Sequence, residues 1–330
     1  MNTKLRGKDF ITLRDYSKDD IETILSLAFD LKIKLASGEP HALLPGKSLG
    51  MLFSYASTRT RVSFETGMTQ LGGHAQYYEP NQLQLGAESW EDTAGTLSRY
   101  IDGIVVRMVS SPQVGEFKYG EARGILNVLS KHASVPVISA CDDQGHPCQV
   151  MADIMTIIEK FGADYKKKKV SLVWVCSKKG INPGVPHDLA VATGTLGMRL
   201  TLACPEGFDP DAEYIEHAKR SAAKSGGVIE IVHNIDEAVK DASVIYGRGW
   251  KAIGKTIDED LNMRKPFKAW RITQQHFDVA TPDAIFMNSM PVSRETDATP
   301  EVIDGPRSVI FDEAENRLHA QKAIMALLMG

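Results

Sequence analysis

The segment LGMLFSYASTRTRVSFETGMTQL, residues 49–71, contains the strand and helix from which the expected fold of this chain follows. Its first part, Leu49–Tyr55, is a short apolar run that predicts a buried strand. Its second part, Thr58–Leu71, predicts a helix. A strand that leads directly into a helix is the repeating unit of α/β proteins with parallel sheets.

The same alternation continues along the whole chain. Further strands are expected at Ala75–Tyr78, Ile104–Met108, Val135–Ala140, Val170–Val175, Leu200–Ala203, Ile229–Val232, Val244–Tyr246, Ile285–Asn288 and Val309–Phe311. Further helices are expected at Asp19–Leu35, Trp90–Tyr100, Gly120–Lys131, Gln149–Phe161, Val185–Leu196, Asp211–Lys224, Ile235–Lys240 and Glu313–Met329. This order predicts parallel sheets covered by helices on both faces.

A length of 330 residues corresponds to two domains of ordinary size. The expected fold class is therefore α/β, with two doubly wound parallel-sheet domains joined by helices. We expect the first domain to comprise residues 1–147 together with 311–330, and the second to comprise residues 148–310.

Composition excludes several classes of protein. The net charge is −4, which disfavours a general nucleic-acid binder. No apolar run approaches the roughly 20 residues that a membrane helix needs, and the first residues lack the apolar core of a signal peptide. The 4 cysteines form no CxxC pair. A reduced, cytoplasmic protein is expected.

Ser57–Arg61, at the start of the expected helix, is a candidate anion site. Backbone N–H groups at a helix N-terminus attract anions, and arginine binds phosphate through paired N–H groups. The alternative is an ordinary Ser or Thr cap beside solvated arginines.

Two further groups of polar residues follow other expected strands. Arg107 ends Ile104–Met108, and His146-Pro147-Cys148-Gln149 comes after Val135–Ala140. Because ligands of parallel sheets bind beyond the carboxyl ends of the strands, these groups are expected to converge with Ser57–Arg61. Cys141, His146 and Cys148 match no common zinc spacing, so no metal is expected there.

Together these motifs resemble the aspartate/ornithine carbamoyltransferase family over nearly the whole chain. The matching segments are Ser57–Glu65, Gln84-Leu85-Gly86 with Glu88-Ser89, Arg107, His146–Gln149 and Asp312–Lys322. Each is moderately specific, and their order and spacing together are highly specific.

The resemblance implies that carbamoyl phosphate is the first substrate. The implied catalytic residues, which would donate to the developing negative charge on the carbonyl oxygen, are Thr60, Arg107 and His146. The implied carbamoyl-phosphate-binding residues are Ser57, Thr58, Arg59, Thr60, Gln84, Arg107, His146, Gln149, Met290 and Arg294. Residues 1–147 with 311–330 would then bind carbamoyl phosphate, and residues 148–310 the acceptor.

The resemblance also implies partners and setting. Family members are homotrimers in which Gln84 would be donated to the active site of a neighbouring subunit. Only small-molecule substrates, carbamoyl phosphate and an amino acid, are implied as ligands, with no metal or organic cofactor. A cytoplasmic role in amino-acid metabolism, such as arginine biosynthesis, is expected.

The acceptor half departs from ornithine carbamoyltransferases. Their Asp-x-x-x-Ser-Met-Gly loop corresponds here to Arg248–Gly254, so an arginine replaces the aspartate that holds an ammonium of ornithine. Like charges placed together cost several kcal/mol. Their His-Cys-Leu-Pro motif is Asn288-Ser289-Met290-Pro291 here. Free ornithine in the usual pose is therefore disfavoured.

These departures resemble the N-acetylornithine and N-succinylornithine carbamoyltransferases, which have a basic residue two positions before a Trp and a long loop ending in Asn. The expected acceptor-binding residues are Lys178, Asn182, Arg248, Trp250, Lys251 and Ser289. Lys179 and Arg294 are further candidate donors. That branch carries a trefoil knot formed by its two acceptor loops, so membership would imply a knot in the second domain.

The expected function is transfer of a carbamoyl group to ornithine or an N-substituted ornithine. Putrescine, lysine, aspartate or an unassigned amine are alternative acceptors. A protein that binds carbamoyl phosphate without turnover is the non-enzymatic alternative, because fold alone does not establish function.

Overall fold

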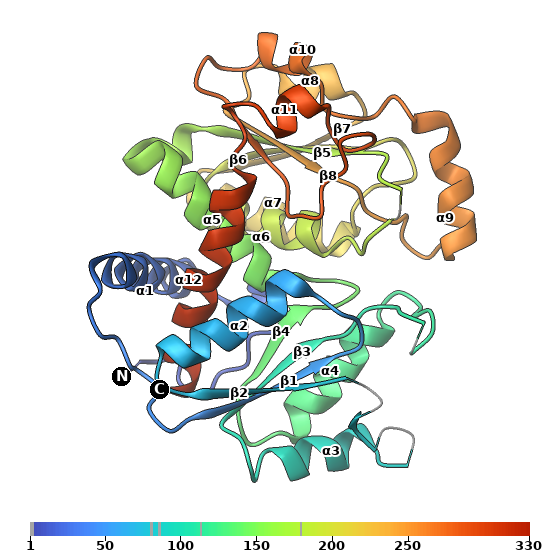
Figure 1. Ribbon diagram of the computed structural model, residues 1–330. Coiled ribbons are helices and arrows are strands. Elements are labelled where there is room, and N and C mark those ends of the chain that lie inside the picture. Colours follow the sequence, from blue (N-terminus) through green and yellow to red (C-terminus); the bar gives the residue numbers. More distant parts are fainter. Residues whose placement is uncertain (1–2, 80–81, 85–86, 113, 179) are drawn as a thin grey trace. The chain divides into compact units, whose positions relative to one another are not determined.

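The computed structural model describes residues 3–79, 82–84, 87–112, 114–178 and 180–330. These form two compact units, residues 1–155 with 315–330 and residues 156–314. Each unit has one parallel sheet with helices on both faces, which confirms the expected α/β class (Figure 1). The domain limits expected from the sequence, 147/148 and 310/311, and the expected knot remain predictions.

The first unit contains a four-stranded sheet in the order β2-β1-β3-β4. Its strands are β1 (Ser48–Phe53), β2 (His74–Tyr78), β3 (Gly103–Arg107) and β4 (Val137–Cys141). All pairs are parallel, and Phe53 at the end of β1 is in register with Arg107 at the end of β3. The chain moves outward from β1 to β2 and then returns to the other side of β1 as β3. The strand order therefore reverses between β1 and β3.

One face of this sheet is covered by α3 (Trp90–Leu97) and α4 (Glu121–His132). Ala94 and Leu126 from these helices pack in one apolar cluster with strand residues Leu52 and Ile104. Full burial of each large aliphatic side chain contributes about 1.5–3 kcal/mol.

The other helices of this unit are α1 (Lys18–Ser37), α2 (Thr58–Gln70) and the residues of α12 (Ile310–Met329) that follow 314. Lys32 Nζ of α1 donates to Asn316 Oδ1 of α12 over 2.9 Å, and Ser63 Oγ of α2 donates to Gln321 Oε1 of α12 over 2.8 Å. α12 thus fixes both α1 and α2. The start of α1 is set by a capping box between Ser17 and Asp20.

The second unit contains a five-stranded sheet in the order β7-β6-β5-β8-β9. Its strands are β5 (Lys169–Trp174), β6 (Arg199–Ala203), β7 (Val228–Val232), β8 (Val244–Arg248) and β9 (Ile285–Met287), all parallel. Here the strand order reverses between β5 and β8.

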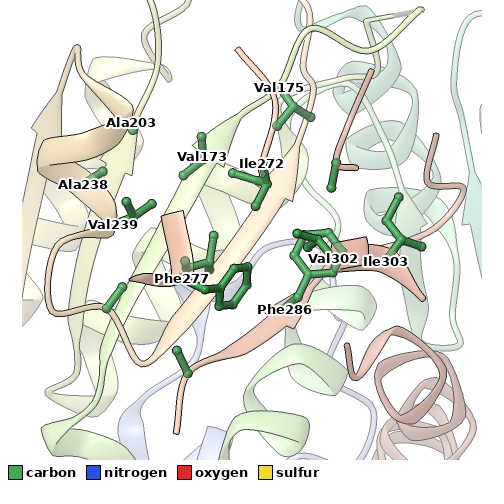
Figure 2. Close-up of a cluster of buried hydrophobic side chains, with 14 of the residues drawn as sticks. Val173, Val175, Ala203, Ala238, Val239, Ile272, Phe277, Phe286, Val302 and Ile303 are labelled. Carbon is green, nitrogen blue, oxygen red and sulfur yellow. The ribbon is translucent and has the colours of Figure 1, made fainter. Parts of the chain in front are cut away.

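The helices of this unit cover both faces of the sheet. α6 (Gly184–Leu196) and α7 (Ala212–Ser225) lie together, and α8 (Ile235–Val239), α10 (Gln274–Asp278) and α11 (Pro300–Ile303) lie on the opposite face (Figure 1). Figure 2 shows the apolar core beneath this second group, a cluster that contains Phe286 of β9 together with Val239, Phe277 and Val302.

The observed secondary structure differs from the prediction in two places. The strand expected at Val309–Phe311 is wrong, because α12 begins at Ile310 and only Ser308 forms an isolated bridge, to Phe286. Asp312 and Glu313 in its first turn complement the positive end of the helix dipole. The sequence patterns also missed α9 (Ile257–Arg264), α10 and α11, which are short and follow polar segments.

α5 (Pro147–Phe161) and α12 pass from one unit into the other. Among the helices of the described residues, none combines the length and the apolarity that crossing a membrane requires.

Candidate active site

In the first unit, several of the predicted carbamoyl-phosphate-binding residues lie where the strand order reverses. Ser57–Thr60 follow β1, and Arg107 is the last residue of the adjacent β3. A crevice at such a reversal is the usual ligand position in open α/β sheets. The sheet thus places these two groups side by side.

The N-terminus of α2 is open to an anion. Ser57 is the N-cap residue with extended backbone, yet its side chain makes no capping hydrogen bond. The first backbone N–H groups of the helix are therefore not used by that hydroxyl. Arg61 is turned elsewhere, because its Nε donates to Glu65 Oε1 over 3.0 Å and its guanidinium stacks on Tyr77.

The carboxylate of Asp142 holds the loop that precedes α5. Asp142 is fully buried and forms a two-pronged ion pair with Arg123, with N–O distances of 3.0 and 2.9 Å. Its Oδ1 also accepts from the backbone N–H groups of Gln144 and Gly145, each over 2.8 Å. This fixed loop positions His146, which is 6% exposed, directly before the start of α5.

Arg317 is a site residue that sequence reasoning missed. It lies on α12, is 2% exposed, and its guanidinium joins two predicted site residues. Nη1 donates to Gln149 Oε1 over 2.6 Å, and Nη2 donates to Thr60 Oγ1 over 3.2 Å. Nε donates to Gln321 Oε1 over 3.1 Å. The available signal was its place within the Asp312–Lys322 motif.

The charges at this position favour an anion. The oxygens that accept from Arg317 in these bonds are neutral, and burial lowers the pKa of Arg317, with the nearby Arg107 cation acting in the same direction. Arg107 Nε is buried with no hydrogen-bond partner in the described part of the chain. A buried guanidinium with a second, half-buried cation beside it would gain from a bound dianion.

Gln84 is positioned differently from these residues. Its backbone oxygen accepts from Ala87 and Glu88 N–H groups over 3.1 and 2.9 Å, and the residue is exposed. Leu85 and Gly86 of the same motif lie outside the described residues, as does Lys179. An exposed Gln84 is available to a neighbouring molecule.

The acceptor residues predicted in the second unit follow the strands at its own reversal point. Lys178 and Asn182 come after β5, and Arg248, Trp250 and Lys251 end or follow β8. The two loops are joined by a hydrogen bond of 2.7 Å from Lys251 N to Ile181 O.

Trp250 is a core residue in this unit. It is 0% exposed, and its indole Nε1 donates to Phe208 O over 2.7 Å. Its own carbonyl accepts from Trp174 Nε1 over 2.9 Å and from Arg264 Nη2 over 2.6 Å. In this arrangement Trp250 supports the loop, and its predicted contact with the acceptor remains a prediction.

Arg248 and the segment after β9 form a buried polar cluster. Arg248 is 6% exposed, and its Nη1 donates to Ser289 O over 2.7 Å. Within the described residues, Arg248 Nε, Asn288 Oδ1 and Ser289 Oγ are buried without hydrogen-bond partners. Native proteins rarely leave such groups unsatisfied, so their grouping here indicates a ligand position.

Glu313 fixes the segment that carries Ser289. Its carboxylate accepts from Asn288 N over 2.9 Å and from Tyr246 Oη over 3.1 Å. Asn288 Nδ2 in turn donates to Gly247 O over 2.6 Å. β8 and the residues after β9 are thus held in one register.

Other predicted residues have partners at the surface. Lys178 pairs with Glu295 at 2.5 Å, and both side chains are exposed. Arg294 forms a two-pronged pair with Asp304, which raises the pKa of Arg294. Asn182 Oδ1 accepts from Gly184 N at the start of α6 over 3.4 Å.

Met290 is half-buried and precedes a cis peptide bond to Pro291. Its expected contact with the carbamoyl group, like the ligand roles of the other predicted residues, remains a prediction.

Comparison with known proteins gives two family-model matches. Residues 8–159 match the aspartate/ornithine carbamoyltransferase carbamoyl-P binding domain, and residues 168–328 match the aspartate/ornithine carbamoyltransferase Asp/Orn binding domain.

Relatives and solved structures match over the full length. Ornithine carbamoyltransferase of Thermococcus kodakarensis is 43% identical, with 100% of this chain and 99% of the relative covered. The structure of ornithine carbamoyltransferase from Pyrococcus furiosus has a TM-score of 0.89 at 43% identity, covering 100% of this chain and 99% of that one. An acetylornithine transcarbamylase complexed with acetylcitrulline has a TM-score of 0.89 at 31% identity, covering 98% and 99%.

Gly249 gives a test of the loop geometry. A Cβ at Gly249 would lie 2.7 Å from Val175 O and would also meet Ser177 Oγ, whereas a Cβ at Gly247 would make only contacts of 3.4 Å or longer. Gly249→Ala should therefore destabilise the second unit by about 1–3 kcal/mol. Gly247→Ala, the matched control, should be neutral or stabilising by up to about 1 kcal/mol. Denaturant unfolding measures both, and equal midpoints would contradict the described packing.

Proposed function

Because the chain belongs to the aspartate/ornithine carbamoyltransferase family, it is a carbamoyltransferase that acts on ornithine or an ornithine-like amino acid, and we propose which of its residues carry the reaction. The first unit binds carbamoyl phosphate at the reversal between β1 and β3. The observation that carries this assignment is the buried fork of Arg317, which ties Thr60 of α2 to Gln149 of α5 beside Arg107.

The roles follow from where charge lies in the substrate. The phosphate rests on Ser57, Thr58, Arg59 and the backbone N–H groups at the N-terminus of α2. Thr60, Arg107 and His146 direct donors at the carbonyl oxygen, where negative charge develops. The carbamoyl NH2 is held by Gln149 and by backbone oxygens near Met290, and Arg294 completes the set when it exchanges Asp304 for substrate.

The reaction needs positioning more than chemical activation. The neutral amine of the acceptor attacks the carbonyl carbon and forms a C–N bond. The C–O bond to phosphate breaks, phosphate leaves with the electron pair, and the amine loses a proton. Holding the two substrates together supplies much of the acceleration.

Arg59 and Arg107 test this assignment. Arg59→Ala and Arg107→Ala should each cost about 2–4 kcal/mol of transition-state stabilisation, because a donor to the phosphate or the oxyanion is lost. Arg61→Ala is the matched control. It removes a partly exposed pair with Glu65 and the stacking on Tyr77, so kcat/KM should change by no more than about threefold. Near-normal turnover in the Arg59 or Arg107 variant would sink the assignment.

The acceptor donates a side-chain amine of the ornithine type. This is supported by relatives named ornithine carbamoyltransferase at 43–44% identity and by the likeness to acetylornithine transcarbamylase structures. The relative from Pyrococcus furiosus is named as anabolic. We assign this chain the same biosynthetic direction, in arginine formation.

Arg248 favours an N-acylated ornithine over free ornithine as the acceptor. Its guanidinium is buried and its Nε lacks a partner within the described residues, as do Asn288 Oδ1 and Ser289 Oγ. A free α-ammonium beside a buried guanidinium is repelled, whereas an acyl oxygen accepts from it. Lys178, Asn182, Lys251 and Trp250 then line or support the position of the acyl and carboxylate groups.

An acceptor panel decides between these candidates. Formation of ureido product from carbamoyl phosphate would be measured with ornithine, N-acetylornithine, N-succinylornithine, lysine, putrescine and aspartate. We expect kcat/KM for an acylated ornithine to exceed that for ornithine, and Arg248→Ala to reduce that preference. Preferred turnover of free ornithine by the unaltered chain would overturn the electrostatic argument about Arg248.

The assembly that we assign is a cytoplasmic homotrimer in which Gln84 enters the active site of a neighbouring subunit. The exposure of Gln84 supports this assignment. All 4 cysteines are free, which fits a reducing compartment.

Mixed trimers test the sharing of sites. A Gln84→Ala chain and an Arg107→Ala chain should each be impaired alone. Re-formed mixtures should regain part of the wild-type rate, because some sites then combine an intact Arg107 with an intact Gln84 from the neighbour. Absence of rescue in mixtures that sedimentation shows to be trimeric would count against sharing.

A further inference from the structure

Cys204, Asp209 and His233 bring potential metal-binding atoms together in the second unit. One ligand atom from each residue lies within 4.8 Å of the other two. Cys204 directly follows β6, and His233 directly follows the neighbouring strand β7. Asp209 lies in the loop between β6 and α7. The carboxyl ends of two adjacent parallel strands therefore supply two of the three groups.

The histidine is already oriented as a ligand. His233 Nδ1 lies 2.8 Å from Cys204 O, and a carbonyl oxygen only accepts, so Nδ1 carries the proton. Nε2 then presents its lone pair, and it lies 3.8 Å from Asp209 Oδ1. A histidine that donates one N–H to a carbonyl and binds metal through the other nitrogen is the usual second-shell arrangement.

The aspartate is held in a similar way. Asp209 Oδ2 accepts from Gly207 N over 3.3 Å, which leaves Oδ1 as the oxygen nearest the histidine. Cys204 is a free, fully buried thiol, whereas the side chains of Asp209 and His233 are half-exposed. The three residues therefore offer one sulfur, one nitrogen and one oxygen within 4.8 Å of one another.

We propose that Cys204, Asp209 and His233 bind one divalent transition-metal ion of the zinc class. A thiolate, an imidazole and a carboxylate suit Zn²⁺, and three protein ligands leave the fourth tetrahedral position to water. Ligand atoms around tetrahedral zinc are about 3.3–3.8 Å apart. The three groups lie within 4.8 Å of one another, so binding needs only a small inward movement of these side chains.

This site is separate from the acceptor residues of the same sheet. Those residues follow β5, β8 and β9, whereas the metal ligands follow β6 and β7 at the other end of the order. The loop between Cys204 and Asp209 nevertheless contains Phe208, whose carbonyl accepts from Trp250 Nε1. A bound ion would tie both ends of that loop and stabilise the support of Trp250.

Cobalt titration tests the proposal on the full chain. After dialysis against a chelator and its removal, Co²⁺ should bind with a stoichiometry of one per chain and give a thiolate-to-cobalt charge-transfer band, which Zn²⁺ then abolishes. Zn²⁺ should also raise the thermal midpoint of the unaltered chain. The band should vanish in Cys204→Ala and persist in Cys176→Ala, the control that removes another thiol of the same unit.

Asp209→Asn keeps the test decisive if Cys204→Ala fails to fold, because Asp209 is exposed. Its affinity for Co²⁺ should fall by at least about tenfold, since even outer-shell changes cost about 10–100-fold. An unaltered chain with no thiolate band, a band lost in Cys176→Ala, or unchanged affinity in Asp209→Asn would each overturn the proposal. The cluster would then be a His–Asp surface pair beside an inert thiol.

Discussion

The buried guanidinium of Arg317 holds together the carbamoyl-phosphate site that we propose. It lies in α12, far along the chain from the residues it binds, and its fork sets Thr60 of α2 and Gln149 of α5 at once. A buried arginine bonded to neutral oxygens is costly by itself. Arg107 lies close enough to lower the pKa of Arg317 further, and under the proposed function a dianionic substrate offsets the cost of burying this cation.

The same principle organises the second unit. Arg248 is also buried, and its neighbours after β9 keep polar atoms unused within the described residues. Carboxylates fix the surrounding backbone instead of neutralising the cation directly. Glu313 holds Asn288, and Asp260 holds Arg264, whose guanidinium bonds the Trp250 carbonyl. Arg317 contacts Thr60, which follows β1, and Arg248 ends β8, so each unit holds a buried arginine near the point where its strand order reverses.

Much of this fold could be predicted because its signals are local. The apolar run of β1 followed by Ser57–Arg61 identifies a strand and a helix, and Arg107 stands at the end of another apolar run. Since parallel strands share one carboxyl edge, these residues were expected to converge. Sheet order places β1 beside β3 and confirms the fold class.

Other features depend on contacts that sequence pattern does not contain. Arg317 donates a hydrogen bond to Thr60 across a separation of 257 residues, and a contact over that distance cannot be predicted from the local periodicity of apolar residues. The Val309–Phe311 run consists of strand-forming residues. Its last two residues nevertheless belong to α12, whose first turn contains the acidic residues Asp312 and Glu313. The burial of Trp250 is likewise set by Phe208 and Arg264, which lie in other segments.

The role of the Arg317 guanidinium can be measured through the binding of carbamoyl phosphate to an Arg317→Met chain. Titration calorimetry would compare its affinity with that of the unaltered chain, and circular dichroism would confirm that both are folded. The account predicts a dissociation constant at least about tenfold higher, because the cation that anchors Thr60 and Gln149 is lost. An unchanged dissociation constant in a folded Arg317→Met chain would contradict it.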